Sequence, residues 1–109
     1  MSRLSSFINV PKMLISLLSP MMKQTEYERL FFRMQRASNP HTFEAVQLFH
    51  LLELMVVLRD SYTSLYADYL NPDIDRIFSE TIDSCMHTIA KYSEQIRQEA
   101  EAHSGAGTF

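Results

Sequence analysis

Glycine is absent from the first 104 residues, and both glycines, Gly105 and Gly107, lie among the last five. Glycine readily adopts the positive φ angles that tight hairpin turns and phosphate-binding loops require. Walker-type loops and dinucleotide-binding fingerprints also need glycines at fixed spacing. The sequence therefore excludes these nucleotide-binding motifs and favours a fold without tight β-hairpins.

Cysteine is nearly absent as well, because Cys85 is the only one. A single cysteine cannot form a disulfide within the chain, and we interpret Cys85 as a small buried apolar residue. A catalytic triad needs a nucleophile on a strained turn, but the Ser, His and Asp residues here lie in predicted helices or helix caps. We therefore expect no enzymatic activity and no cofactor.

Long uninterrupted apolar runs are also missing. Between Phe7 and Met22, polar residues and prolines interrupt the apolar ones, so no run approaches the ~20 residues of a membrane span. A secretory signal would need an unbroken apolar centre and a small-residue cleavage site, and neither is clear. A mitochondrial presequence is the better alternative because no acid precedes Glu26, but arginine is scarce. We expect a cytoplasmic protein.

The best candidates for metal ligands are His50 and Glu53, together with Asp83 and His87. Each pair has the spacing of one helix face, but the Glu-x-x-His repeat of carboxylate-bridged bundle sites does not occur. The alternative is a set of solvated polar residues, or a loose ion pair between Arg59 and Asp83. We expect no metal site.

The four prolines divide the chain into four predicted helices, at about residues 11–19, 24–37, 40–70 and 72–103. Three of the prolines directly follow Ser or Asn, which is typical of an N-cap followed by proline at the first helical position. These pairs are Ser19-Pro20, Asn39-Pro40 and Asn71-Pro72. A capping box formed by Thr25 and Glu28 is a second possible start for the second helix.

Apolar residues in the third and fourth helices alternate in steps of three and four, which is the heptad pattern of a coiled-coil seam. The seam residues are Leu48, Leu51, Met55, Leu58, Tyr62, Leu65 and Tyr69, followed by Phe78, Ile82, Cys85, Ile89, Tyr92 and Ile96. Because the joint at residues 70–72 is short, the two helices should fold back antiparallel.

The predicted fold is therefore all-α. It consists of a long, coiled-coil-like antiparallel helical hairpin over residues 38–103, preceded by two shorter helices in residues 1–37 and followed by a flexible tail over residues 104–109. A third helix of residues 40–70 would be a rod of about 46 Å. We expect an elongated molecule that exposes much of its length.

Charge is unevenly distributed along the chain. Residues 1–36 carry six basic and two acidic side chains, whereas residues 37–109 carry four basic and eleven acidic ones. The N-terminal helices are therefore basic and amphipathic, and the hairpin is acidic. Either the first part folds onto the second, or the two parts face different partners.

The third helix is apolar nearly all round, because Phe49, Leu52 and Val56 form a second stripe and Leu54 and Val57 nearly complete the circle. One seam cannot cover such a helix. The cover must come from the chain's own N-terminal helices, from a second copy or from another protein. The candidate partner-binding residues are Phe49, Leu52, Val56, Val57, Phe32, Leu14, Leu17 and Leu18.

These features favour a small acidic helical protein–protein interaction module: an adaptor, chaperone or regulatory subunit that self-associates or binds a larger partner. One alternative is a peripheral protein that docks on a membrane surface through residues 3–23. Another is a nucleic-acid-binding regulator that uses Arg29, Arg33 and Arg36, which the acidic remainder of the chain disfavours. The sequence leaves open whether residues 1–23 pack on the hairpin, bind a partner or touch a membrane.

Overall fold

The computed structural model describes residues 4–39 and 41–107, and the side chains of residues 8–39 and 41–102. This part of the chain contains four α-helices, one short 3-10 helix and no strand, which confirms the prediction of an all-α protein. The elements are α1 (Leu4–Leu18), η1 (Ser19–Met21), α2 (Gln24–Ala37), α3 (Glu44–Leu65) and α4 (Pro72–Gly107).

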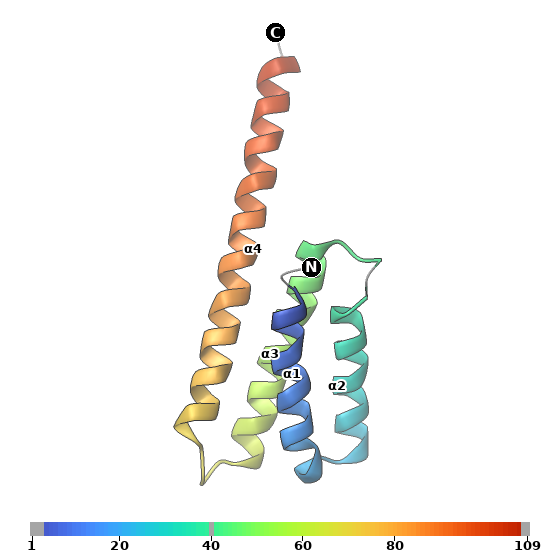
Figure 1. Ribbon diagram of the computed structural model, residues 1–109, viewed down its shortest axis with the longest axis vertical. Helices are drawn as coiled ribbons and strands as arrows, with labels where there is room; N and C mark the ends of the chain where they lie inside the picture. The colour runs from blue at the N-terminus through green and yellow to red at the C-terminus, as the bar shows by residue number, and fades with distance from the viewer. Residues whose placement is uncertain (1–3, 40, 108–109) are drawn as a thin grey trace.

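The helices α1, α2 and α3 and the first part of α4 pack side by side, and successive helices run in opposite directions (Figure 1). All four contribute to one hydrophobic core, so the N-terminal helices cover α3 within a single chain. The largest fully buried side chains on α3 are Leu48, Leu51, Leu54, Met55, Leu58 and Tyr62. The remainder of α4 extends alone beyond the other helices (Figure 1).

The molecule is elongated, as predicted, with extents of 62 × 28 × 23 Å and a radius of gyration of 17.0 Å. A compact chain of this length would have a radius of gyration of about 13 Å. The solvent-accessible surface is 7645 Å², whereas a compact protein of this mass exposes about 6,200 Å². The chain therefore exposes roughly a fifth more surface than its size requires.

The helix responsible for the length is α4 and not α3. The 36 residues of α4 span about 54 Å, whereas the 22 residues of α3 span about 33 Å. The prediction of a third helix over residues 40–70 was wrong at both ends. The helix does not start at Asn39-Pro40 but at Glu44, with Phe43 at the N-cap position. Pro40 itself lies outside the described residues.

A tyrosine fixes the connection between α3 and α4, and this explains why α3 ends early. The Tyr62 hydroxyl accepts a hydrogen bond of 2.5 Å from the Asn71 backbone N–H. The Tyr62 ring lies 5.5 Å from the Phe78 ring, measured between centroids, and thereby joins the two helices. The chain turns back over residues 66–71 so that Asn71 can reach this hydroxyl.

The start of α4 confirms the prediction made from Asn71-Pro72. The helix begins at Pro72, and the Asn71 side-chain Oδ1 accepts a hydrogen bond of 2.8 Å from the Asp73 backbone N–H. This is the usual N-cap geometry. The helix continues to Gly107, beyond the predicted end near His103, and residues 108–109 of the predicted tail lie outside the described part.

Two other predicted helix starts are corrected. The helix α1 begins at Leu4 and contains the buried Pro11, although a proline within a helix removes a backbone hydrogen bond. Ile8 and Val10 precede Pro11 and pack against the core, and this packing offsets the loss. Ser19 and Pro20 form the short turn η1, and α2 starts after Lys23 without a side-chain cap, so Thr25 and Glu28 form no capping box.

Two leucines of α1 that are three residues apart test this packing. Leu14 is completely buried, whereas Leu17 is half-exposed. We expect Leu14→Ala to lower the free energy of unfolding by about 2–5 kcal/mol because it leaves a cavity. Leu17→Ala, the matched control, should lower it by less than about 1 kcal/mol. Urea unfolding followed by circular dichroism measures both, and equal losses would contradict the orientation of α1.

Candidate interaction surfaces

The exposed side of α3 carries large apolar residues. Phe49 is 52% exposed and Val56 is 44% exposed, and Val46 is exposed to a similar degree. Steps of three and seven residues place these three side chains on one face of the helix. We call Val46, Phe49 and Val56 the outer face of α3. These three side chains form the apolar surface of α3 that the other helices leave uncovered.

Other residues predicted to bind a partner lie in the core. Leu52 and Val57 are partly buried and pack against it. Leu14 and Leu18 are completely buried within one chain, so no partner can reach them while the bundle is intact. We therefore remove Leu14 and Leu18 from the interaction surface. Helical spacing alone could not separate them from Leu17, because all three lie near one stripe of α1.

Leu17 does lie on the surface. It is half-exposed, as are Met13 and Met21, which precede and follow it by four residues. We call Met13 and Leu17, together with Met21 of the following η1, the α1 stripe. Lys12 and Lys23 are exposed near its two ends. The α1 stripe therefore combines apolar and basic groups.

The helix α2 presents exposed aromatic rings. Phe32 is 64% exposed, and Tyr27 and Phe31 stack with their ring centroids 6.5 Å apart. These residues and Glu28 line a shallow hollow of about 430 Å³. Aromatic residues and arginine are enriched at protein–protein interfaces.

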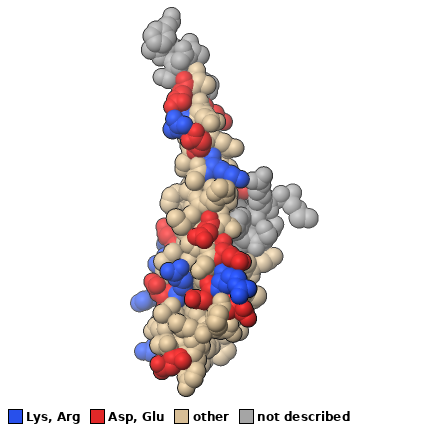
Figure 2. All heavy atoms as spheres, turned by 90° about the vertical axis from the view of Figure 1, so that its left-hand side faces the viewer, with Lys and Arg blue, Asp and Glu red and all other residues tan. Residues whose placement is uncertain are grey.

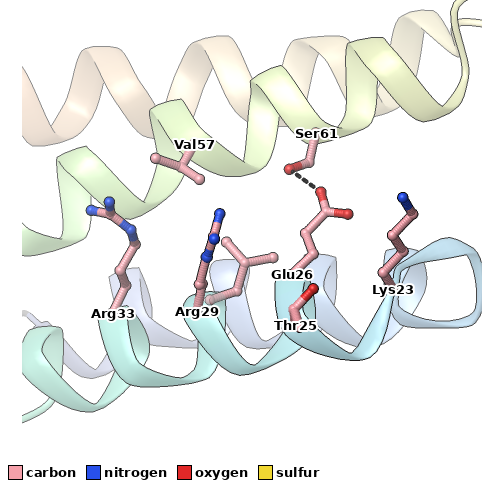
Figure 3. Close-up of a pocket in the computed structure, with 8 residues that line it drawn as sticks. Lys23, Thr25, Glu26, Arg29, Arg33, Val57 and Ser61 are labelled. Atoms are coloured by element: carbon pink, nitrogen blue, oxygen red, sulfur yellow. Dashed lines mark hydrogen bonds between the residues drawn. The ribbon is translucent and has the colours of Figure 1, made fainter.

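A groove of about 390 Å³ that is lined by Lys23, Arg29 and Arg33 lies along the contact between α2 and α3 (Figure 3). The Ser61 hydroxyl donates a hydrogen bond of 2.8 Å to the Glu26 carboxylate across it. Arg33 forms an ion pair with Glu53 of α3, with an N–O distance of 3.7 Å. Figure 3 shows the side chains of Arg29 and Arg33 projecting from α2 toward α3.

The three arginines considered for nucleic-acid binding are therefore not equivalent. Arg33 is held by Glu53, whereas Arg29 and Arg36 are exposed, and none of the ion pairs among the described side chains includes them. The contacts made by Glu26 and Glu53 link helices distant in the sequence, and no local pattern indicates them.

The free part of α4 is a surface that the sequence analysis did not single out. Every residue from Ser93 to Ala102 is exposed, and we call this segment the α4 extension. Ile96 is its large apolar residue and is 62% exposed. Figure 2 views the molecule from the side of α4 and shows the extension as a narrow column with acidic and basic side chains next to one another.

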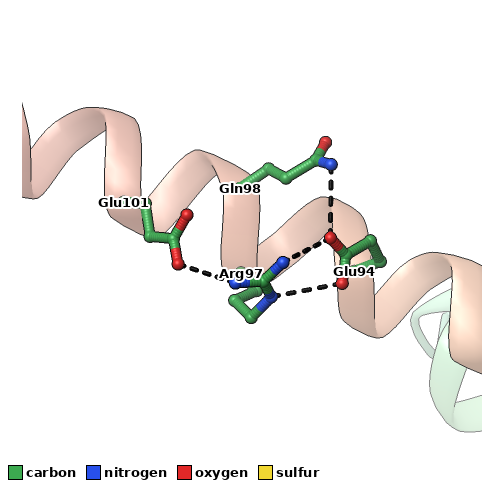
Figure 4. Close-up of polar contacts among 4 residues, drawn as sticks. All are labelled: Glu94, Arg97, Gln98 and Glu101. Atoms are coloured by element: carbon green, nitrogen blue, oxygen red, sulfur yellow. Dashed lines mark hydrogen bonds and ion pairs between the residues drawn. The ribbon is translucent and has the colours of Figure 1, made fainter.

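A ladder of charged groups stabilises the α4 extension as a helix (Figure 4). The Arg97 guanidinium donates to Glu94 at 2.5 and 3.1 Å and to Glu101 at 2.7 Å. Hydrogen bonding to Arg97 lowers the pKa of Glu94, and the same contact raises the pKa of Arg97. Spacings of three and four residues support an isolated helix in this way.

The structure does not bring together the residues that the sequence offered as candidates for metal binding or ion pairing. Among the residues described, no three His, Cys, Asp or Glu side chains are placed to hold a metal ion, so His50, Glu53, Asp83 and His87 form no such group. Arg59 and Asp83 form none of the ion pairs found in the described part of the chain. Cys85 is completely buried, and burial raises the pKa of its thiol to about 11.

No protein-family model, curated protein or solved structure matches this chain. Within the described residues, none of the helices combines the length and the apolar character needed to cross a bilayer. The surfaces themselves must therefore carry any functional conclusion.

The burial of Cys85 predicts slow thiol chemistry. Because only the thiolate reacts, raising the pKa from 9.0 to about 11 lowers the reactive fraction at pH 8 by about 100-fold. We expect Cys85 to react with a disulfide reagent at least that much more slowly in the native protein than in urea. Ser84→Cys in a Cys85→Ala chain is the exposed control and should react rapidly. Rapid native labelling of Cys85 would contradict its burial.

Proposed function

We propose that this protein is a small helical protein–protein interaction module, acting as an adaptor, chaperone or regulatory subunit, and that the outer face of α3 is its docking surface. The observation that supports this proposal is the exposure of Val46, Phe49 and Val56 on a helix whose opposite side is buried in the core. Burying one such side chain contributes about 1.5–3 kcal/mol. Because the three side chains are each about half exposed, a partner that covers them gains a part of this amount from each, which favours association.

The scaffold suits this role. Among the described side chains, no buried polar atom lacks a hydrogen-bond partner, so the bundle can present its surface without an internal defect. In our proposal, α3 and α4 form a coiled-coil-like hairpin that holds the outer face of α3 straight. An amphipathic helix of a partner fits such a face, with apolar residues repeating at steps of three and four.

A photoreactive residue tests the docking surface. We expect p-benzoylphenylalanine in place of Phe49 to yield one light-dependent adduct of defined mass in the cells that naturally produce the protein. The matched control is the same residue in place of Tyr69, an exposed aromatic residue between α3 and α4. The change Val56→Asp should suppress the adduct at position 49, because Val56 lies one heptad away on the same face.

An adduct of twice the chain mass would identify a second copy, and any other mass a different protein. Equal labelling from positions 49 and 69, or none from position 49, would contradict the proposal.

A second candidate function is docking on an anionic membrane surface, and the α1 stripe favours it. Met13, Leu17 and Met21 are exposed beside Lys12 and Lys23, which is the composition of a helix that lies in a membrane interface. Deleting residues 3–23 is an unsuitable test, because α1 supplies Leu14 and Leu18 to the core.

Point substitutions avoid this problem. If the α1 stripe docks on membranes, the protein should cosediment with phosphatidylglycerol vesicles at low salt and dissociate at high salt. Met13→Ser with Leu17→Ser should abolish cosedimentation, whereas Phe49→Ser with Val56→Ser, the control on α3, should not. Equal binding to uncharged phosphatidylcholine vesicles would contradict this mode of docking.

A further inference from the structure

One face of α2 and one face of α4 share a complementary pattern. On α2, Arg29, Phe32 and Arg36 are separated by three and then four residues, which places their backbone positions on one face, with the Arg29 side chain at the edge nearest α3 (Figure 3). On α4, the same steps counted backwards from Glu99 lead to Ile96 and then to Tyr92. We call Arg29, Phe32 and Arg36 the α2 face, and Tyr92, Ile96 and Glu99 the α4 face.

The two patterns match when the helices run antiparallel. Sliding one helix along the other to place Ile96 against Phe32 also places Glu99 level with Arg29 and Tyr92 level with Arg36. The central contact joins two of the most exposed apolar side chains of the molecule, which are 62% and 64% exposed. On one side of it the Glu99 carboxylate meets the Arg29 guanidinium.

The α4 face continues a seam that already packs helices together. Phe78, Ile82 and Cys85 are the buried seam residues of α4 that contribute to the core with α3. The next seam residues, Ile89, Tyr92 and Ile96, follow at the same alternating steps, but α3 does not accompany α4 over its whole length (Figure 1). At Ile96, which is 62% exposed, the seam therefore lacks a second helix among the described elements.

We propose that this helix is α2 of a second copy, so that the α4 extension of each copy lies antiparallel along the α2 face of the other. The same chain cannot make this contact, because α2 and α4 lie on opposite sides of the bundle (Figure 1). A two-fold axis perpendicular to the long axis brings the ends of the two bundles together. It makes the contact twice, once for each extension.

Charge and surface area support a second copy as the occupant. Arg29 and Arg36 belong to the basic N-terminal part of the chain and Glu99 to the acidic part, so each copy supplies both halves of the contact. Neither Arg29 nor Glu99 takes part in an ion pair among the described residues. The surface in excess of a compact protein is roughly 1,400 Å², while a standard interface buries about 800 Å² on each partner.

The end of the bundle is consistent with this arrangement. Phe43 directly precedes α3 and is almost fully exposed, and the start of α3 lies at the end of the bundle past which α4 continues (Figure 1). In the two-fold dimer this end faces its equivalent in the other copy. Phe43 would then be covered by the same association that covers Ile96.

This inference rests on the proposed function, since it names one partner of an interaction module, but it uses faces distinct from the outer face of α3. Charge reversal provides the test. Arg29→Glu alone places two acids opposite each other in a homodimer, and Glu99→Arg alone places two cations opposite each other. Mixing the two variants restores an opposite-charge pair at both contacts.

Sedimentation equilibrium of the full chain should show a wild-type dimer. We expect each single variant to raise the dissociation constant by at least about tenfold. The equimolar mixture should form a heterodimer with an affinity within about threefold of the wild type. Ile96→Asp should abolish the dimer while leaving the helical circular dichroism and the thermal unfolding unchanged, because Ile96 lies outside the core.

The matched controls are Arg59→Glu and Asp60→Arg, which make the same charge changes at exposed positions of α3 and should leave the dimer intact. A wild-type chain that stays monomeric at 100 µM, set as roughly a hundred times a micromolar dissociation constant, would overturn the proposal. So would single variants that dimerise like the wild type, or a mixture that remains monomeric. Labelling from position 49 reads the outer face of α3 independently, so either proposal can fail without the other.

Discussion

The burial of α3 on several sides is the constraint on which the rest of the structure depends. This helix is too apolar for one partner, and α4 alone cannot cover it. The helices α1 and α2 therefore pack on it as well and complete a single core. This packing explains why α1 remains helical through Pro11 and why Leu14 and Leu18 point inward. It also brings Arg33 of α2 close enough to Glu53 of α3 to form an ion pair. What remains uncovered on α3 is the outer face.

Much of this fold could be predicted because the hydrophobic spacing is regular. The seam of α3 is buried from Leu48 to Tyr62, and the seam of α4 is buried at Phe78, Ile82 and Cys85. The start of α4 was predictable because Asn71 and Pro72 act locally. The end of α3 was not, because it depends on the Tyr62 hydroxyl reaching Asn71 across nine residues.

The candidate surfaces were predicted less completely. The composition of α3 showed that it carried more apolar residues than one seam could cover, and Phe49 and Val56 are indeed exposed. Which leucines of α1 face inward depends on how the helix is rotated against α3, and spacing leaves that rotation open. The α4 extension was missed because its residues match the heptad pattern of a packed helix. Only the structure shows that α4 continues past the N-terminal end of α3 (Figure 1).

The α4 extension also has a consequence for cooperativity. Within the described part of the chain, no neighbouring element protects its backbone hydrogen bonds, and residues 93–102 bury no side chain. Short helices without tertiary packing open readily in water, so its amide protons exchange with solvent much faster than those near Tyr62 or Phe78. The ladder centred on Arg97 keeps the helical state populated and thereby lowers the entropy lost when the segment becomes ordered on a surface. The α4 extension is thus the least stable part of α4. It is also the part that loses little conformational entropy when it binds to a surface.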